Sequence, residues 1–175
     1  MIKRILLMAV FSLLALPALA QQTKNGEWDS WRFVLGDWTA SEGGGKPGEA
    51  SSGGLSFSFD LQGKVLIRRS YSEYPATKDR PAFRHDDLTV IYHDANGKDA
   101  RAISFDNEGH VIQYSASFSE DNRKLTFSSD ASAGPRFRLV FSRLSDDSMK
   151  VEFFIAPPEK PEAFSKYVEG MLKRK

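Results

Sequence analysis

Apolar and polar residues alternate along most of the chain with a period of two, which is the pattern of half-buried β-strands. The clearest example is segment 55–60, where serines separate Leu55, Phe57 and Phe59. The same alternation returns in the segment 110–118. Phenylalanine supplies much of the apolar side of this pattern, with 13 copies in 175 residues. The pattern therefore predicts a β-sheet protein with an aromatic core.

Short turn signals separate the alternating segments. They include Asn96-Gly97, which favours a tight hairpin because both central residues of a type I′ turn have positive φ. We expect strands over residues 35–40, 55–60, 64–74, 88–93, 100–105, 110–118, 125–129, 137–143 and 149–156. Since no long helical pattern interrupts them, sequential antiparallel pairing is favoured. The predicted fold is all-β: one antiparallel barrel of about 8–10 strands.

The two ends of this domain have a different pattern. Trp28 and Trp31 lie three residues apart, so a helical turn over residues 29–33 would place both rings on one face and close one end of the barrel. Near the C-terminus, apolar residues recur at helical spacing after Pro161, which predicts an amphipathic helix at about 159–173 on the barrel exterior. The segment 41–54, rich in Gly and Ser, is expected to be a loop.

Residues 1–20 have the features of a secretory signal peptide. Lys3 and Arg4 precede an apolar run from Ile5 to Leu16, and Ala18-Leu19-Ala20 provides a small-residue cleavage site after Ala20. The run is shorter than the about 20 residues needed to cross a bilayer. We therefore expect a periplasmic or secreted protein without integral membrane association. Residues 21–27 would form a flexible N-terminus, and residues 28–175 the barrel domain.

Composition excludes several kinds of function. The chain has no cysteine, which excludes thiolate catalysis, cysteine-ligated zinc and iron–sulfur clusters. The 24 basic and 23 acidic residues nearly balance, so there is no electrostatic footprint for nucleic acid.

Two arginines on one predicted strand are candidates for ligand binding. Arg68 and Arg69 are neighbours, so only one of them can point into the barrel. Arg69 shares a face with Tyr71, and if that face is inward, its planar guanidinium would suit a carboxylate head group. Surface solvation is the alternative for both charges.

A second candidate pair is His110 and Tyr114, which lie on one face of a strand. Directed inward, they would be polar groups in an apolar cavity, a common way for a cavity to orient its ligand. The alternative is that His110 caps the turn after Gly109 while Tyr114 packs in the core. The apolar lining of the expected cup is Phe57, Phe59, Tyr71, Tyr114 and Phe153.

The segment Leu35-Gly36-Asp37-Trp38 resembles the Gly-x-Trp signature of lipocalin-like (calycin) barrels. Several longer segments resemble exported bacterial proteins of unknown function with lipocalin-like folds. They are 59–69, 85–88, 105–114 and 135–139. This resemblance implies a single barrel that encloses a small ligand.

A more distant resemblance is to nitrobindins, which are haem-binding barrels with a Gly-x-Trp and a glycine-rich stretch. Gly43 to Gly45 match that stretch, but the family binds iron through a histidine near the C-terminus, and no histidine follows His110. Haem is therefore possible but disfavoured, and no cofactor is expected. No metal site is expected either, because His85 and His93 would lie about 26 Å apart along an extended strand.

These observations lead to three hypotheses of different class. The favoured one is a binding module whose partner is a small hydrophobic or amphipathic molecule held in the barrel. The alternative is a structural or interaction barrel filled by its own side chains, since an eight-stranded barrel is just narrow enough to be filled. An enzyme is disfavoured and would need an acid or base among His110, Glu73 and Asp106, so no catalytic residue is assigned.

Overall fold

The computed structural model describes residues 26–40, 50–94 and 99–175, and in this part of the chain ten strands form one closed antiparallel barrel. This confirms the predicted fold class. The elements are η1 (Asp29–Trp31), β1 (Gly36–Ala40), β2 (Ser52–Asp60), η2 (Leu61–Gly63), β3 (Val65–Tyr74), β4 (Phe83–His93), β5 (Ala100–Asp106), β6 (Val111–Phe118), β7 (Lys124–Ser129), β8 (Arg136–Arg143), β9 (Ser148–Ala156) and β10 (Ser165–Arg174).

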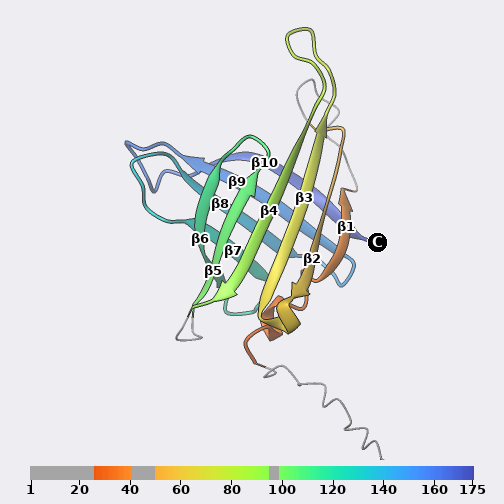
Figure 1. Cartoon of the computed structure of the whole chain (residues 1–175), viewed down its shortest axis with the longest axis vertical. Helices are drawn as coiled ribbons and strands as arrows, with labels where there is room; N and C mark the ends of the chain where they lie inside the picture. Colours follow the sequence, from red (N-terminus) through yellow and green to blue (C-terminus); the bar gives the residue numbers. More distant parts are fainter. Residues whose placement is uncertain (1–25, 41–49, 95–98) are drawn as a thin grey trace, which may run out of the picture.

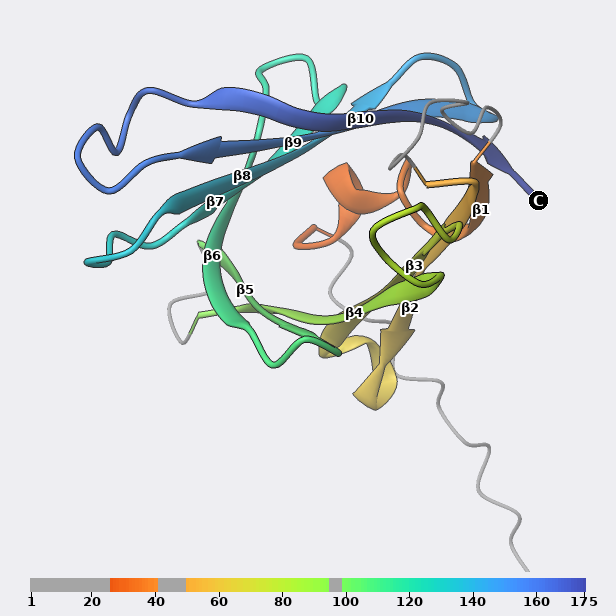
Figure 2. The same ribbon diagram turned by 90° about the horizontal axis from the view of Figure 1, so that it is seen from above.

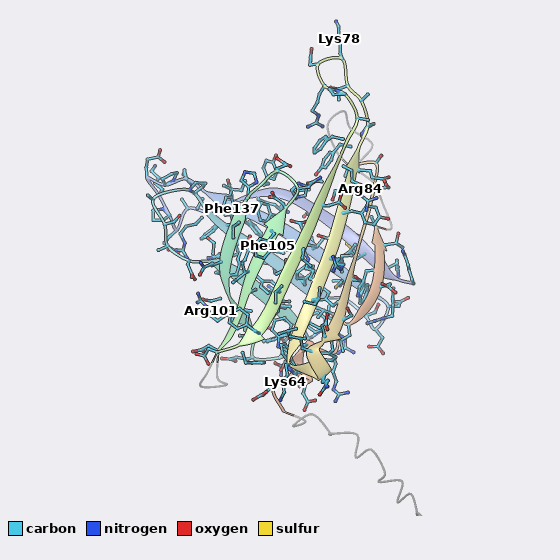
Figure 3. All side chains as sticks on the ribbon, viewed as in Figure 1. Lys64, Lys78, Arg84, Arg101, Phe105 and Phe137 are labelled. Atoms are coloured by element: carbon cyan, nitrogen blue, oxygen red, sulfur yellow. The ribbon has the colours of Figure 1, made fainter. Side chains whose placement is uncertain are left out.

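Each strand pairs with the next one along the chain, and β1 closes the barrel by pairing with both β2 and β10. At this closure Trp38 of β1 is paired with Leu55 of β2 on one side and with Arg174 of β10 on the other. The strands tilt around the axis, and the β3–β4 hairpin extends well beyond its neighbours at one end (Figure 1). Lys78 lies at the tip of that hairpin, whereas Lys64 lies at the opposite end of the barrel (Figure 3).

The N-terminal segment closes the end of the barrel opposite to this hairpin, and η1 lies within the ring of strands when the barrel is seen along its axis (Figure 2). Trp31 is 1 % exposed and packs edge-on against Trp28 and Phe118, at ring distances of 5.5 and 5.1 Å. The Trp38 indole N–H donates to the Val34 carbonyl at 2.8 Å. The predicted helical turn is therefore present, as a short 3₁₀ turn that packs its two tryptophans together.

Arg174 also fastens the closed end. Its guanidinium stacks on the Trp38 ring at 4.2 Å and donates to the carbonyl oxygens of Phe33 and Leu35. The last strand is thereby tied to the segment that precedes the first. The Gly-x-Trp segment is thus a packing element of the closed end.

The prediction of a C-terminal helix at about 159–173 is wrong, because Ser165–Arg174 form strand β10. The register between β10 and β9 shifts between Lys166 and Val168, as a β-bulge produces. The extra residue puts Tyr167 and Val168 out of strict alternation, which created the apparent helical spacing. A tenth strand also supplies the hydrogen bonds that β9 and β1 need to close the barrel, and closure removes both sheet edges.

The predicted strand limits agree with the structure to within a few residues, with two larger differences. β4 begins at Phe83, five residues before the expected start, and β2 begins at Ser52, within the expected loop 41–54. The Asn96-Gly97 turn lies outside the described residues, but the antiparallel pairing of β4 with β5 agrees with a hairpin there. The predicted signal peptide over residues 1–20 also lies outside the described residues. Within those residues, no helix combines the length and apolarity that a membrane span requires.

Candidate functional site: a cup at the open end of the barrel

The inward-facing side chains pack differently in the two halves of the barrel. Near the closed end, Trp31, Leu125 and Phe127 are 0–2 % exposed and form a continuous core. Toward the open end, inward-facing apolar residues of β6, β8 and β9 are only partly buried. They are Ile112, Phe137, Leu139, Val151 and Phe153. The closed half is therefore filled by side chains, whereas the open half leaves these inward-facing apolar side chains partly uncovered. We call this end of the interior the cup.

One wall of this cup is polar. Cross-strand pairing places Arg68, Thr89 and Ser104 in one row on β3, β4 and β5, and they are 7, 3 and 8 % exposed. Ser70 and Asp87 lie in the next row toward the open end. Because side chains on one face of paired strands adjoin, these groups form a continuous polar surface inside the barrel.

Arg68 is the centre of this wall. Its Nη1 donates to Thr89 Oγ1 at 3.2 Å, and its Nη2 donates to Ser70 Oγ at 2.7 Å. Asp87 Oδ2 lies 3.7 Å from Nη2 and accepts from Ser70 at 2.7 Å. The Nε is buried without a hydrogen-bond partner. A guanidinium has five N–H donors, so this one keeps donors for a further acceptor.

Burial lowers the pKa of Arg68, and the negative charge of Asp87 opposes that effect. Because an arginine in a protein stays protonated, Arg68 is a buried cation with one nearby counter-ion. A buried charge is tolerated when it is paired and hydrogen-bonded, and Asp87 with the hydroxyls of Ser70 and Thr89 provides both.

Buried aromatic side chains adjoin this polar wall, beginning with Phe57, the cross-strand partner of Arg68 on β2. Phe141 is fully buried, lies 5.8 Å from the Arg68 guanidinium carbon, and packs edge-on against Phe57 at 5.5 Å. Tyr114 is 5 % exposed and contacts Phe127 edge-on at 6.2 Å. Burial raises the pKa of the Tyr114 hydroxyl, so it is protonated and available as a hydrogen-bond donor. The interior thus places buried aromatic rings next to the polar wall.

Acidic and histidine side chains surround the rim on the polar side. Asp106 pairs with Asp87 across β4 and β5, and His85 lies 3.4 Å from Asp87 and 2.7 Å from Glu108. Burial would lower the pKa of His85, but its hydrogen bond to Glu108 and the charge of Asp87 raise it above its ordinary value. Burial would raise the pKa of Asp106, yet hydrogen bonds from the N–H groups of His110 and Glu108 hold it below its ordinary value.

The prediction that Arg69 and Tyr71 point inward is corrected by the strand register. Arg68 is the inward member of the pair, so Arg69 and Tyr71 project from the outer face of β3. There they border a shallow hollow of about 450 Å³ with Arg84, Leu88 and Phe105. Arg84 stacks on the Tyr71 ring at 4.2 Å and donates to Asp86 at 2.9 Å. Figure 3 labels Arg84 on β4 and Phe105 on β5.

The other predicted residues fall in different places. Phe57 and Tyr114 lie in the barrel interior, and Phe153 lies in the open half, where it stacks on Phe137 at 5.8 Å. Phe59 lies at the closed end against Trp28 and is 43 % exposed, so it does not line the cup.

His110 is also outside the interior. Its imidazole is 63 % exposed, and Nδ1 lies 2.8 Å from Asp106 Oδ2 while its backbone N–H donates to Oδ1 of the same residue. This is the turn-capping arrangement. The ligand-binding interpretation required His110 to point into the apolar interior, and it does not. Glu73 is not part of this pair: it accepts from Ser52 at 2.5 Å and lies 3.5 Å from Arg84.

Sequence reasoning did not select Arg68 because its strand is apolar on both faces. Val65 and Ile67 lie on the outer face with Arg69, whereas only Leu66 precedes Arg68 on the inner face. The serines provided the available signal: Ser70 and Ser72 share the parity of Arg68, and small hydroxyl groups beside an arginine suit an interior polar wall.

Among the described residues, no group of three or more histidine, aspartate and glutamate side chains is arranged to hold a metal ion. No known protein-family model matches the chain, and no curated protein shows significant similarity to its sequence.

Proposed function

We propose that this chain is an exported binding module whose barrel takes a small hydrophobic or amphipathic molecule at its open end. The observation that carries the proposal is the unequal packing of the two halves of the barrel. Three tryptophans fill the closed end, whereas Ile112 and Val151 keep uncovered surface toward the open end. Side chains that face inward yet stay uncovered are suited to contact with a ligand.

The energetics favour an amphipathic ligand. Covering apolar surface contributes roughly 25 cal/mol per Å², from which the entropy of association is subtracted. The polar wall then fixes orientation, because Arg68 and the Tyr114 hydroxyl offer donors inside an otherwise apolar enclosure. Apolar lining with a few convergent polar groups is the usual composition of a small-molecule site.

The alternative is a barrel filled by its own side chains. The closed half is filled in this way, and in a fully filled barrel the same packing would continue to the rim of the open end. The partial burial of Leu139, Val151 and Phe153 favours the binding module over this alternative.

The proposal also includes export of the protein and a relationship to lipocalin-like barrels. The features of residues 1–20 support a signal peptide, with a periplasmic or secreted mature protein. The closed antiparallel barrel that opens on a Gly-x-Trp strand supports a lipocalin-like relationship.

A fluorescence titration tests the binding function. The mature protein, residues 21–175 without the predicted signal peptide, is titrated with N-phenyl-1-naphthylamine, an uncharged apolar probe. Two matched variants are titrated in the same way. Val151→Phe narrows the cup from within, whereas Val111→Phe enlarges a side chain that is 60 % exposed on the outer face. We expect saturable binding that Val151→Phe weakens by about tenfold or more and Val111→Phe leaves unchanged. Equal binding by all three proteins would refute a site in the barrel.

A further inference from the structure

The charges around Arg68 indicate which head group the cup accepts. Arg68 has one carboxylate counter-ion already, since Asp87 lies 3.7 Å away and shares Ser70 with it. Asp106 follows on the next strand, opposite Asp87. The side chains of Asp87 and Asp106 are 24 % and 10 % exposed, so both carboxylates are largely shielded from water.

The three charges act on the same part of the interior. Arg68, Asp87 and Asp106 lie on the adjoining strands β3, β4 and β5, and Asp87 is paired directly with Asp106. Phe57 and Phe141, whose rings adjoin Arg68, are uncharged. At the rim, Glu108 adds a negative charge, and the histidines His85 and His110 face Glu108, Asp87 and Asp106. When those histidines are neutral, the polar wall carries more negative than positive charge.

A carboxylate ligand would enter a place where the cation is already neutralised. Its charge would lose water without gaining an unpaired positive partner, and it would approach two aspartates. An uncharged oxygen acceptor avoids both costs. It accepts from Arg68, whose two hydrogen bonds to Thr89 and Ser70 leave further N–H donors, and adds no charge to the wall.

We propose that the cup selects an amphipathic molecule with an uncharged oxygen head group, such as an ester, amide or ketone, over the corresponding free carboxylate. This rests on the proposed function of the cup as a binding site. The apolar tail would lie toward Leu139, Val151 and Phe153, and the head-group oxygen would accept from Arg68. Asp87 acts as a specificity residue, because its charge excludes the acid.

The test compares 11-(dansylamino)undecanoic acid with its methyl ester. Both are titrated by dansyl fluorescence into the mature protein at pH 8, where the acid is ionised. We expect the ester to bind at least about tenfold more tightly than the acid, because one like charge within ~8 Å at an effective dielectric of ~20 exceeds one tenfold step. Arg68→Met should weaken ester binding by about tenfold, as expected when a hydrogen bond to a charged donor is lost.

The Asp87→Asn variant gives the decisive comparison. Removing this charge should strengthen acid binding by about tenfold and leave ester binding nearly unchanged. Asp86→Asn is the control, since Asp86 is adjacent on β4 but bonds Arg84 on the outer face. Asp106→Asn is the second variant, with the same expectation if Asp87→Asn fails to fold by circular dichroism.

The outcomes separate this inference from the proposed function. If neither probe binds, the cup is not a site for such molecules and the proposed function fails. If both bind but the acid binds as tightly as the ester, or Asp87→Asn and Asp106→Asn leave acid binding unchanged, only the head-group inference is overturned.

Discussion

Two phenylalanines on the strands that flank β8 offer a direct test of the half-filled barrel. Phe127 and Phe153 both face inward and both pair with Leu139, on opposite sides of it. Phe127 is 2 % exposed in the core of the closed half, whereas Phe153 is partly exposed in the open half. The same change, Phe→Ala, should therefore have very different effects on the free energy of unfolding.

The expected magnitudes follow from burial. Phe127 contacts Trp31, Tyr114 and Phe141, so its removal leaves a cavity that these rings cannot fill. Phe127→Ala should cost about 3–5 kcal/mol. Phe153 stacks on Phe137 and contacts Tyr167, but part of its ring already meets solvent. Phe153→Ala should cost only about 1 kcal/mol, a fraction of full phenylalanine burial.

Thermal unfolding followed by circular dichroism measures the difference. For a domain of this size, about 2–4 °C in Tm corresponds to 1 kcal/mol. We expect Phe127→Ala to lower Tm by about 6–20 °C and Phe153→Ala by about 2–4 °C. Comparable losses from both variants would mean that the open half is as tightly packed as the closed half, which would refute the cup.

Three further predictions concern single residues. The folded-state pKa of His85 is raised, so its ion pair with Glu108 stabilises the fold fully below the unfolded pKa of about 6.5 and less as the pH rises through the folded pKa. His85→Asn should therefore lower the urea midpoint more at pH 5.5 than at pH 8.5. Equal losses at the two pH values would contradict this. Arg174→Ala should cost about 1–2 kcal/mol in a urea titration, because it removes the stacking on Trp38 and three hydrogen bonds to carbonyls. An unchanged midpoint would exclude a role of Arg174 in stabilising the closed end. Leu61 is 66 % exposed at φ 47°, so Leu61→Asn should raise stability by up to about 1 kcal/mol, measured as a higher Tm; a lower Tm would show that its side chain contributes packing.

Most of the strands could be predicted because alternation and turn chemistry are local. Segments such as Val111–Phe118 carry both signals within ten residues. β10 could not be predicted in the same way, because its bulge near Tyr167 breaks the alternation. What fixes Ser165–Arg174 as a strand is the need of β9 and β1 for a partner, and that need exists only in the closed barrel.

The candidate site was harder to predict than the fold. A strand pattern determines which residues share a face, but the choice between Arg68 and Arg69 depends on which face is inward, and β3 has apolar residues on both. The partners of Arg68, Thr89 and Ser104, come from other strands through register. The interior phenylalanine Phe57 was predictable, since its neighbours on the same strand are serines.

The most direct test of the central claim is a methyl NMR titration of the mature protein with methyl 11-(dansylamino)undecanoate. The account predicts chemical-shift changes at the methyl groups of Ile112, Leu139 and Val151 in the open half. The methyl groups of Leu66 and Leu125 in the filled half, and of Val111 on the outer face, should keep their positions. Shifts confined to Val111 and other outward-facing methyl groups, or no shifts at saturating probe, would contradict a ligand cup inside the barrel.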